Sequence, residues 1–220
     1  MMDMIRVGIV GRDGRLGLGA AAWVHEAPDM ELSGAVGPSD DWLALRDCDV
    51  ALEVTQAGLG AAHGLRLIEM GLRPVIGTSG VNAAETQELD RSARAAGLGG
   101  VVIPNFSVGM LAMQRALAAA GEHFTDSAIT EVHRAGKIDA PSGTAKALCG
   151  LLEHSDDQVV SVRLDGLTAA HEVRLSSSFD ELVLRHESLG PESFKTGVLA
   201  SIRYASTALG ISSGLEVVLS

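Results

Sequence analysis

The sequence predicts an α/β protein, with an N-terminal Rossmann-type parallel sheet and a second α+β domain built on a mixed or antiparallel sheet. Three observations predict this fold class. Short apolar runs alternate with alanine-rich segments of helical spacing up to residue 107. Glycines follow the first apolar run, where the first helix opens. After Phe106 the β-rich runs follow one another more closely.

The first half alternates strands and helices of the lengths that βαβ units use. Apolar, β-rich runs predict strands at residues 5–11, 30–36, 48–55, 73–80 and 99–107. Alanine content and apolar spacing predict helices at 18–27, 61–71 and 83–97. Strands and helices in this order indicate a parallel sheet.

The second half is expected to start with a helix at 110–122. Strands follow at 126–136, 158–164, 167–177 and 181–188, with a helix at 142–153 and a return to helical character at 193–206. We therefore place a first domain at 1–105 and a second at 106–193. A C-terminal helix over 194–220 is expected to pack back on the first domain.

Composition excludes several classes of function. The net charge is −11, aromatic residues make up 3% of the chain, and no basic cluster could follow a phosphate backbone, so nucleic acid is not expected as a partner. Local cations could still hold a small anionic substrate. The two cysteines, Cys48 and Cys149, indicate buried thiols of a reducing compartment. With no membrane-length apolar run and no signal peptide ahead of the first strand, we expect a cytoplasmic protein.

The segment "GIVGRDGRLG" places Gly11, Gly14 and Gly17 between the first strand and the first helix. Glycine lets the backbone turn sharply and approach a pyrophosphate, which then lies at the helix N-terminus. The spacing is G-x-x-G-x-x-G, with Asp13 where the commoner pattern has its middle glycine. The segment predicts a dinucleotide site, and the alternative is a tight turn with only a structural role.

Cofactor preference depends on the end of the second strand, where an acidic residue binds the adenosine ribose of NAD. This chain has glycine and proline at 37–38, and its aspartates come only at 40–41. Arg12 and Arg15 lie in the glycine loop itself. We therefore expect NADPH, or no strong preference over NADH. Alternatively, both arginines are solvated surface residues.

The segment "IGTSG" (76–80) follows another strand, at the edge of the sheet where open α/β folds bind ligands. Its small residues would allow a flat ring to approach the backbone. Taken alone, the segment could be any loop that caps a helix.

The segment "TEVHRAGKIDAPSGTA" sets His133 and Lys137 four residues apart, just before a helix whose plausible N-cap is Ser142. A helix N-terminus favours an anion, and a nearby lysine would hold a carboxylate from a second side. Histidine can act as an acid or base near neutral pH. The alternatives are an ordinary helix start after Pro141 and a histidine with only a structural role.

Together, G-x-x-G-R-x-G, "IGTSG", "NFSVGM" and "EVHRAGKIDAPSGTA" resemble the dihydrodipicolinate reductase family, in the same order and over most of the chain. The resemblance implies an NAD(P)-binding Rossmann domain and a domain for substrate binding and tetramerisation. It implies reduction of 4-hydroxy-tetrahydrodipicolinate, a cyclic dicarboxylate made from pyruvate and aspartate semialdehyde, to tetrahydrodipicolinate in lysine and diaminopimelate synthesis. The resemblance implies a homotetramer, with a dimer as the alternative.

The resemblance also implies roles for individual residues. His133 would be the catalytic histidine and Lys137 the proton donor. The substrate would be bound by Arg134, Ser142, Gly143 and Thr144. NADPH or NADH would be bound by Gly11, Arg12, Gly14, Arg15, Leu16, Gly17, Gly77, Thr78, Ser79, Pro104, Asn105 and Phe106. No metal is expected.

Three departures from the family pattern bear on the substrate. Arg134 follows His133 where the family has a second histidine, and arginine cannot move a proton at neutral pH. Pro191 stands where the family has an arginine, and the chain is shorter between Gly150 and Ser161. His171 and His186 match family strand positions, with support of the sheet as the simpler interpretation.

Two alternatives to the lysine-pathway reaction stay open. The chain could be a paralogue that reduces a different cyclic imine or unsaturated heterocyclic acid, which Arg134, Pro191 and the shorter segment favour. It could also be a non-catalytic dinucleotide-binding protein, although His133 and Lys137 would then have no purpose.

Overall fold

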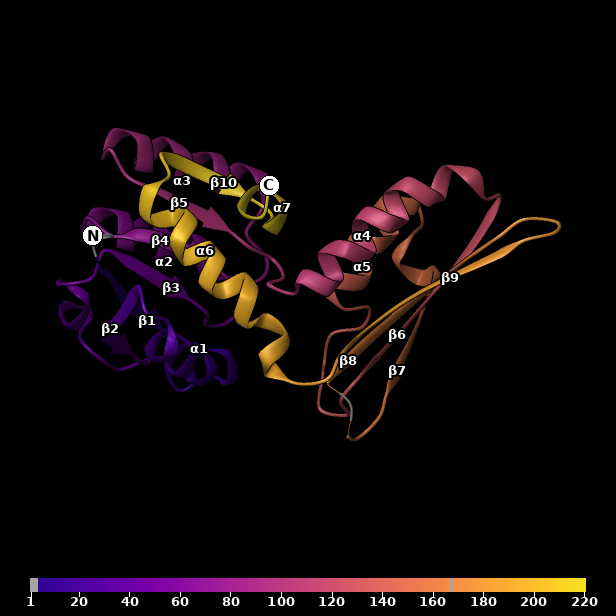
Figure 1. Cartoon of the computed structure of the whole chain (residues 1–220), viewed down its shortest axis with the longest axis horizontal. Helices are drawn as coiled ribbons and strands as arrows, with labels where there is room; N and C mark the ends of the chain where they lie inside the picture. The colour runs from indigo at the N-terminus through magenta and orange to yellow at the C-terminus, as the bar shows by residue number, and fades with distance from the viewer. Residues whose placement is uncertain (1–3, 167) are drawn as a thin grey trace. The chain divides into compact units, whose positions relative to one another are not determined.

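The computed structural model describes residues 4–166 and 168–220, which form two compact units. The first unit comprises the chain up to Phe106 together with Phe194–Ser220, and the second comprises Ser107–Ser193 (Figure 1). Residues 1–3, ahead of the first expected strand, and Leu167, the first residue of the strand expected at 167–177, lie outside the described residues.

The first unit contains a six-stranded parallel sheet. Its order is β10-β5-β4-β3-β1-β2. The strands are β1 (Ile5–Val10), β2 (Met30–Val36), β3 (Val50–Glu53), β4 (Arg73–Ile76), β5 (Gly99–Val102) and β10 (Gly210–Ser213). The chain leaves β1 toward β2 at one edge and then returns to β3 on the other side of β1. That reversal is the point at which open α/β sheets bind ligands.

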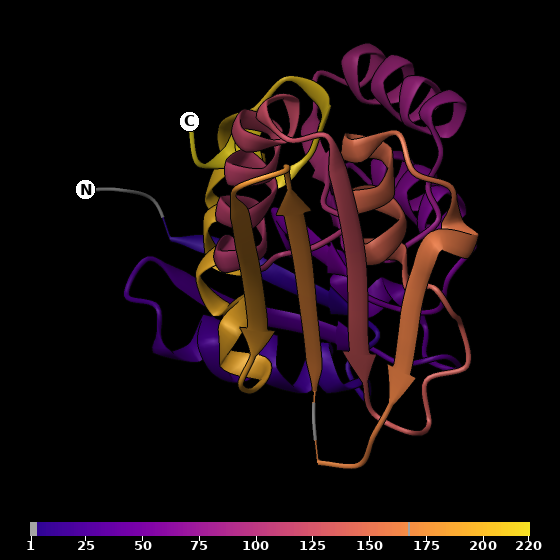
Figure 2. The same cartoon turned by 90° about the vertical axis from the view of Figure 1, so that its right-hand side faces the viewer.

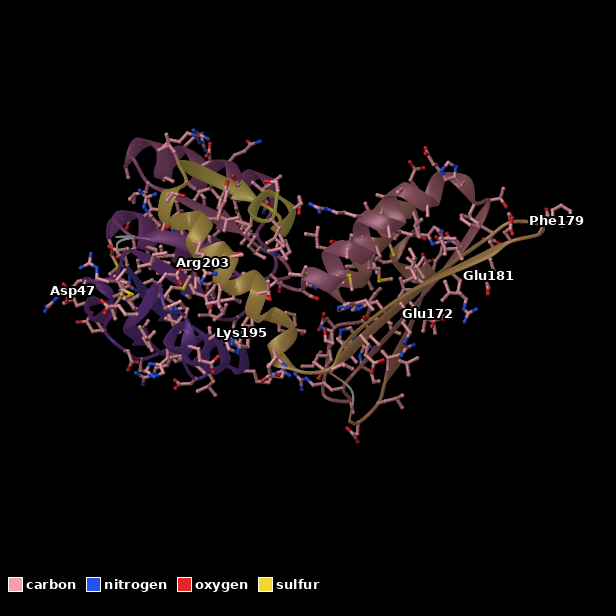
Figure 3. All side chains as sticks on the ribbon, in the orientation of Figure 1. Asp47, Glu172, Phe179, Glu181, Lys195 and Arg203 are labelled. Carbon is pink, nitrogen blue, oxygen red and sulfur yellow. The ribbon has the colours of Figure 1, made fainter. Side chains whose placement is uncertain are left out.

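Helices surround this sheet. They are α1 (Arg15–Glu26), α2 (Gly60–Glu69), α3 (Ala83–Ala95), α6 (Lys195–Thr207) and the short α7 (Leu215–Val218), with a 3-10 turn η1 (Trp42–Leu45). Arg203 of α6 forms an ion pair with Asp29 at 2.7 Å, and Lys195 at the start of α6 pairs with Glu26 at the end of α1 (Figure 3). The C-terminal segment is thus tied to the first βαβ unit by charge as well as by packing.

The C-terminal segment differs from the expected helix over 194–220. The helix α6 ends at Thr207, and residues Gly210–Ser213 form the edge strand β10, which pairs in parallel with β5. A Cβ on Gly99 would lie 2.0 Å from the Ala208 carbonyl oxygen, so the chain passes directly over β5 as it turns into this strand. The segment of β10, GISS, has a single apolar side chain, so it lacks the apolar run that predicted the equally short strands β3, β4 and β5.

The second unit has a mixed four-stranded sheet of order β7-β6-β8-β9. Its strands are β6 (Asp126–His133), β7 (Val159–Arg163), β8 (Ala169–Ser176) and β9 (Glu181–Ser188); β6 and β7 are parallel, and the other pairs are antiparallel. The helices α4 (Val108–Ala120) and α5 (Gly143–Leu152) cover one face (Figure 2). The core between them is aliphatic and sulfur-rich: Met110, Met113, Leu117, Ile129, Leu148, Cys149, Val173 and Leu175.

The predicted fold class is confirmed. Several parallel strands are shorter than expected: β3, β4 and β5 end at Glu53, Ile76 and Val102. The residues after each strand form loops at the carboxyl edge of the sheet, which is where the candidate cofactor residues lie. Within 4–166 and 168–220, no helix is both long and apolar enough to cross a bilayer.

Candidate functional site

The glycine loop between β1 and α1 has the close backbone contacts that exclude larger residues. Gly11 has φ +100°, and a Cβ on Gly17 would lie 2.1 Å from the Gly11 carbonyl oxygen. Gly14 is the N-cap of α1 and provides no side chain to cap it. The first amides of α1 are therefore available to an anion, as a pyrophosphate site requires.

A cleft of about 360 Å³ adjoins this loop within the first unit. Its walls come from the segments that follow β1, β2 and β3 and from the start of α2, and they include Gly11, Asp13, Gly14, Gly37, Pro38, Trp42, Thr55, Leu59 and His63. Glu53 is fully buried next to the cleft, and its carboxylate pairs with His63 Nδ1 at 3.0 Å and accepts a hydrogen bond from the Thr55 hydroxyl. The cleft has the position and the size to hold part of a dinucleotide, so the residues present fit that cofactor.

The two loops expected at the nicotinamide are in van der Waals contact. A Cβ on Gly77 would lie 2.4 Å from the ring of Phe106, which is buried, so only glycine fits there. Thr78 is buried and accepts a hydrogen bond from the Thr55 amide at 2.8 Å. The remaining expected residues are Ser79 and Pro104, which are exposed, and Asn105, which is half-buried.

The second site is built on strand β6 of the second unit. Ile129, Glu131 and His133 alternate on its buried face. In the sheet register, Glu131 pairs with Ser161 of β7 on one side and with His171 of β8 on the other. A fully buried glutamate is thus flanked by polar side chains from two neighbouring strands.

Glu131 accepts hydrogen bonds from three directions. Its Oε1 accepts from Arg163 Nη2 at 2.9 Å, from the Ser161 hydroxyl at 2.8 Å and from the Ser142 amide at 3.2 Å. Burial alone would raise the pKa of this carboxyl, but these hydrogen bonds outweigh it and hold the pKa at about 2. The residue is therefore a permanent anion beneath the start of α5.

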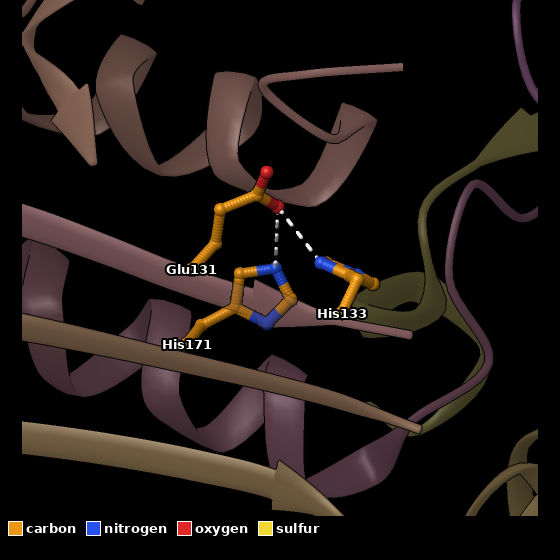
Figure 4. A group of neighbouring side chains, drawn as sticks. All are labelled: Glu131, His133 and His171. Atoms are coloured by element: carbon orange, nitrogen blue, oxygen red, sulfur yellow. Dashed lines mark ion pairs between the residues drawn. The ribbon is translucent and has the colours of Figure 1, made fainter. Parts of the chain in front are cut away.

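Two histidines lie at the other oxygen of this carboxylate. Glu131 Oε2 is 3.0 Å from His133 Nδ1 and 3.9 Å from His171 Nε2 (Figure 4). Burial lowers the pKa of His133; the Glu131 charge opposes this effect, and the charge of Lys137 adds to it. Burial and the His133 charge lower the pKa of His171 to about 4, despite Glu131. Both rings are therefore held predominantly neutral near pH 7.

Lys137 lies in the loop between β6 and α5. Its ammonium group forms an ion pair with Asp139, with N–O distances of 2.7 and 2.8 Å, and the side chain is 23% exposed. Arg163 fixes the loop by donating to the carbonyl oxygens of Lys137 at 3.3 Å and Asp139 at 2.6 Å. The same guanidinium thus links the lysine loop to the buried Glu131.

The other expected substrate residues surround the start of α5. Ser142 is the N-cap, with its hydroxyl accepting from the Ala145 amide at 3.1 Å and lying 3.3 Å from His171 Nε2. Gly143 is exposed, with open space beyond its Cα, and Thr144 is half-buried in the first turn. The structure thus groups His133 with Ser142 around Glu131, and it places Arg134 on the exposed part of the loop.

Glu131, His133 and His171 offer three ligand atoms within 4.8 Å of one another, a set that a metal ion could use. Two features argue for another role. Arg163 already balances the charge of Glu131, and Ser142 lies within hydrogen-bonding distance of His171 Nε2. We interpret the cluster as a network that orients His133 and the start of α5.

Sequence reasoning did not identify Glu131, Ser161 or Arg163, and it assigned His171 only to sheet support. One signal was available: Glu131 and His133 are two residues apart in a predicted strand, so both lie on one face. A buried face that carries a glutamate requires a cation or several donors nearby. The identity of those partners depended on the strand register.

Comparisons with known proteins identify the family of both units. The family model "Dihydrodipicolinate reductase, N-terminus" matches residues 5–106, and "Dihydrodipicolinate reductase, C-terminus" matches residues 108–219. The 4-hydroxy-tetrahydrodipicolinate reductase of a Synechococcus species is 31% identical over the full length of both chains. That of Bacillus velezensis is 29% identical, covering 99% of this chain and 98% of the relative.

A solved structure is also similar over nearly its whole length. It is the dipicolinate-bound dihydrodipicolinate reductase of Paenisporosarcina sp. TG-14, with a TM-score of 0.83 and 28% identity over 97% of this chain and 98% of that one. The diaminopimelate dehydrogenase of C. glutamicum, at 14% identity and a TM-score of 0.61, shares the fold. The chain belongs to the dihydrodipicolinate reductase family, whose members are NAD(P)H-dependent oxidoreductases.

Proposed function

We propose that this protein reduces 4-hydroxy-tetrahydrodipicolinate to tetrahydrodipicolinate, with loss of water and with NADPH or NADH as the reductant, in lysine and diaminopimelate synthesis. The observation that carries the proposal is the loop from His133 to Thr144, in which a lysine and the start of α5 are fixed over the buried Glu131. The names of the curated relatives and of the dipicolinate-bound structure support the same substrate class.

In this proposal, the substrate carboxylates bind to the second unit. The backbone amides of Gly143 and Thr144 open α5 and favour an anion, and Ser142 holds that helix start in place. A substrate carboxylate then replaces Asp139 as the partner of Lys137. The guanidinium of Arg134 provides a second, exposed cation for the same dicarboxylate.

The 4-hydroxyl group and one ring proton leave as water, and reduction of the ring adds a hydride and a proton. The reduced nicotinamide supplies the hydride when it is bound. Lys137 supplies the proton from its ammonium group, and His133 accepts and returns protons at the same place. Glu131 remains ionised, so it orients His133 without giving up a proton itself. The cofactor would be held by the glycine loop from Gly11 to Gly17 and by the two loops at 77–79 and 104–106.

The test is a coupled assay. The labile substrate is generated from pyruvate and aspartate semialdehyde by dihydrodipicolinate synthase, and cofactor oxidation is followed after addition of this protein. Turnover that depends on the synthase supports the proposal. Tight cofactor binding without turnover would contradict it.

The paralogue hypothesis is favoured by the shorter segment between Gly150 and Ser161 and by two residues that differ from the family pattern, Arg134 and Pro191. Both are exposed, Arg134 in the lysine loop and Pro191 at the start of a 3-10 turn (Pro191–Phe194). The same assay with other cyclic imine acids separates the two reactions, because a paralogue would turn over one of these compounds and not the lysine-pathway substrate. A protein that binds NADH but reduces none of them would be a non-catalytic dinucleotide-binding protein.

Two further expectations complete the proposal. We propose a homotetramer, or a dimer, formed through the second unit, where Val160 and Val183 are exposed on the sheet. The segment that links α5 to β7, residues 153–158, is short. The alignment with the Bacillus velezensis relative spans 263 positions, which is more than the 220 residues of this chain. Analytical ultracentrifugation measures the assembly.

We also propose a cytoplasmic location, consistent with the free, buried thiols of Cys48 and Cys149.

A further inference from the structure

The carboxylate of Asp13 lies against the end of β2, although the two segments are far apart along the chain. A Cβ on Gly37 would lie 2.6 Å from Asp13 Oδ2 and 3.5 Å from Asp40 Oδ2. In any aspartate, each carboxylate oxygen lies about 2.4 Å from its own Cβ, from standard bond lengths. If residue 37 were an aspartate, its own carboxylate oxygens would lie at about this distance from its Cβ. Asp13 Oδ2, at 2.6 Å from that position, is therefore nearly as close as they would be.

That position has a known use in dinucleotide-binding sheets. An acidic side chain at the end of the second strand accepts hydrogen bonds from the adenosine ribose and discriminates against a 2′-phosphate. Gly37 has no side chain to offer. Asp13 is 67% exposed and lines the cleft together with Gly37 and Pro38, so its carboxylate is accessible to a ligand there.

The nearest arginine is already engaged by two carboxylates. Arg12 Nη1 lies 2.8 Å from Asp40 Oδ2, and Arg12 Nε donates to Asp13 Oδ1 at 3.3 Å. Asp40 is fixed in turn, because its Oδ2 also accepts from the Gly37 amide at 2.8 Å. These three side chains carry a net charge of −1. Neither Arg12 nor Arg15 is among the residues that line the cleft.

We propose that Asp13 replaces the missing acid of β2, binds the 2′-hydroxyl of the adenosine ribose and selects NADH over NADPH, while Asp40 holds Arg12 away from a 2′-phosphate. This inference rests on the proposed function. It replaces the expectation of NADPH, which rested on the residues that follow the strand along the chain and on the two arginines of the glycine loop. The Asp13 side chain reaches the strand end from the glycine loop, where the commoner motif has a glycine.

The experiment measures the dissociation constants of NADH and NADPH by fluorescence titration, and the kcat/KM ratio for the two cofactors in the coupled assay. The wild-type protein is expected to favour NADH by about tenfold or more. Asp13→Asn should reduce that ratio by about tenfold, mainly through tighter binding of NADPH, since an amide still bonds a hydroxyl but no longer repels a phosphate. Asp40→Asn should also reduce the preference for NADH, because Arg12 would lose its ion pair with Asp40 and become available to a 2′-phosphate.

Asp47→Asn is the matched control. Asp47 is an exposed aspartate of the same unit that pairs with Arg46 and does not line the cleft (Figure 3). The ratio of kcat/KM with NADH to kcat/KM with NADPH should be the same in Asp47→Asn as in the wild type. Preference of the wild type for NADPH, or ratios that are unchanged in both Asp13→Asn and Asp40→Asn, would overturn the inference while leaving the proposed reaction intact. Failure to bind either cofactor would overturn the proposed function as well.

Discussion

Arg163, whose side chain is 19% exposed, forms an ion pair with the fully buried Glu131, with 2.9 Å between Nη2 and Oε1, and the same guanidinium holds the carbonyl oxygens of Lys137 and Asp139. The pair therefore joins strand β6 to the loop that carries the proposed proton donor. Because Glu131 is fully buried, loss of Arg163 would remove a cation and a hydrogen bond that stabilise its carboxylate.

Arg163→Met should lower the free energy of unfolding by about 3 kcal/mol, the range found when one partner of a buried pair is removed. Urea denaturation measures this. Arg185→Met is the control, because Arg185 is 49% exposed and pairs with Glu172 and Glu187 on the sheet surface, where such pairs contribute about 1 kcal/mol or less. Equal decreases in the free energy of unfolding in the two variants would show that the Arg163–Glu131 pair stabilises the fold no more than the exposed pairs do.

Lys137→Ala should reduce kcat by about a hundredfold or more, because a positioned proton donor contributes a factor of this order. The dissociation constant of the cofactor should be unchanged, since the glycine loop belongs to the other unit. Lys146→Ala provides the comparison: Lys146 lies on α5 and forms an exposed ion pair with Asp156. A Lys137→Ala enzyme with a near-normal rate would remove lysine from the proposed proton transfer.

Stability should fall as the pH is lowered from about 6.5 to 4, in part through His171. In the folded protein its pKa is about 4, below the ordinary value of 6.5, so only the unfolded chain takes up a proton in this interval. Protonation then favours unfolding, by up to about 3 kcal/mol. His171→Gln should flatten this part of the stability curve, whereas His123→Gln, at an exposed position, should not. Parallel curves for His171→Gln and the wild type would contradict the assignment.

Gly17→Ala should abolish cofactor binding, because its Cβ would lie 2.1 Å from the Gly11 carbonyl oxygen and would open the loop. Gly150→Ala, within α5, meets no atom within 4 Å and should stabilise the protein by up to about 1 kcal/mol. Fluorescence titration and thermal unfolding measure the two effects. Normal cofactor affinity in Gly17→Ala would show that the loop does not contact the dinucleotide.

Much of the fold was predictable, because the βαβ half has strong local signals. The alternation of apolar runs and helices gave β2 and β9 with the observed bounds and most of the other elements within a few residues. The pattern failed at β10, whose segment GISS has a single apolar side chain and so lacks the apolar run that predicted the other strands. Neither periodicity nor composition could reveal that this segment pairs with β5.

The candidate site was predictable only in part. His133, Lys137 and Ser142 lie in one short segment, so their order along the chain already suggested a shared function. Arg163 meets Glu131 because β7 pairs with β6, and Asp13 reaches Gly37 because the glycine loop folds back over β2. Such partners depend on strand register and loop conformation.

The most direct test of the proposed reaction follows the hydride itself. The coupled assay is run with NADH carrying deuterium at the transferred position of the nicotinamide, and the mass of the product is determined. We predict that wild-type protein gives tetrahydrodipicolinate with one deuterium, and that Lys137→Ala forms this product at least about a hundredfold more slowly. A product without deuterium, or no product while NADH is bound, would contradict the proposed function.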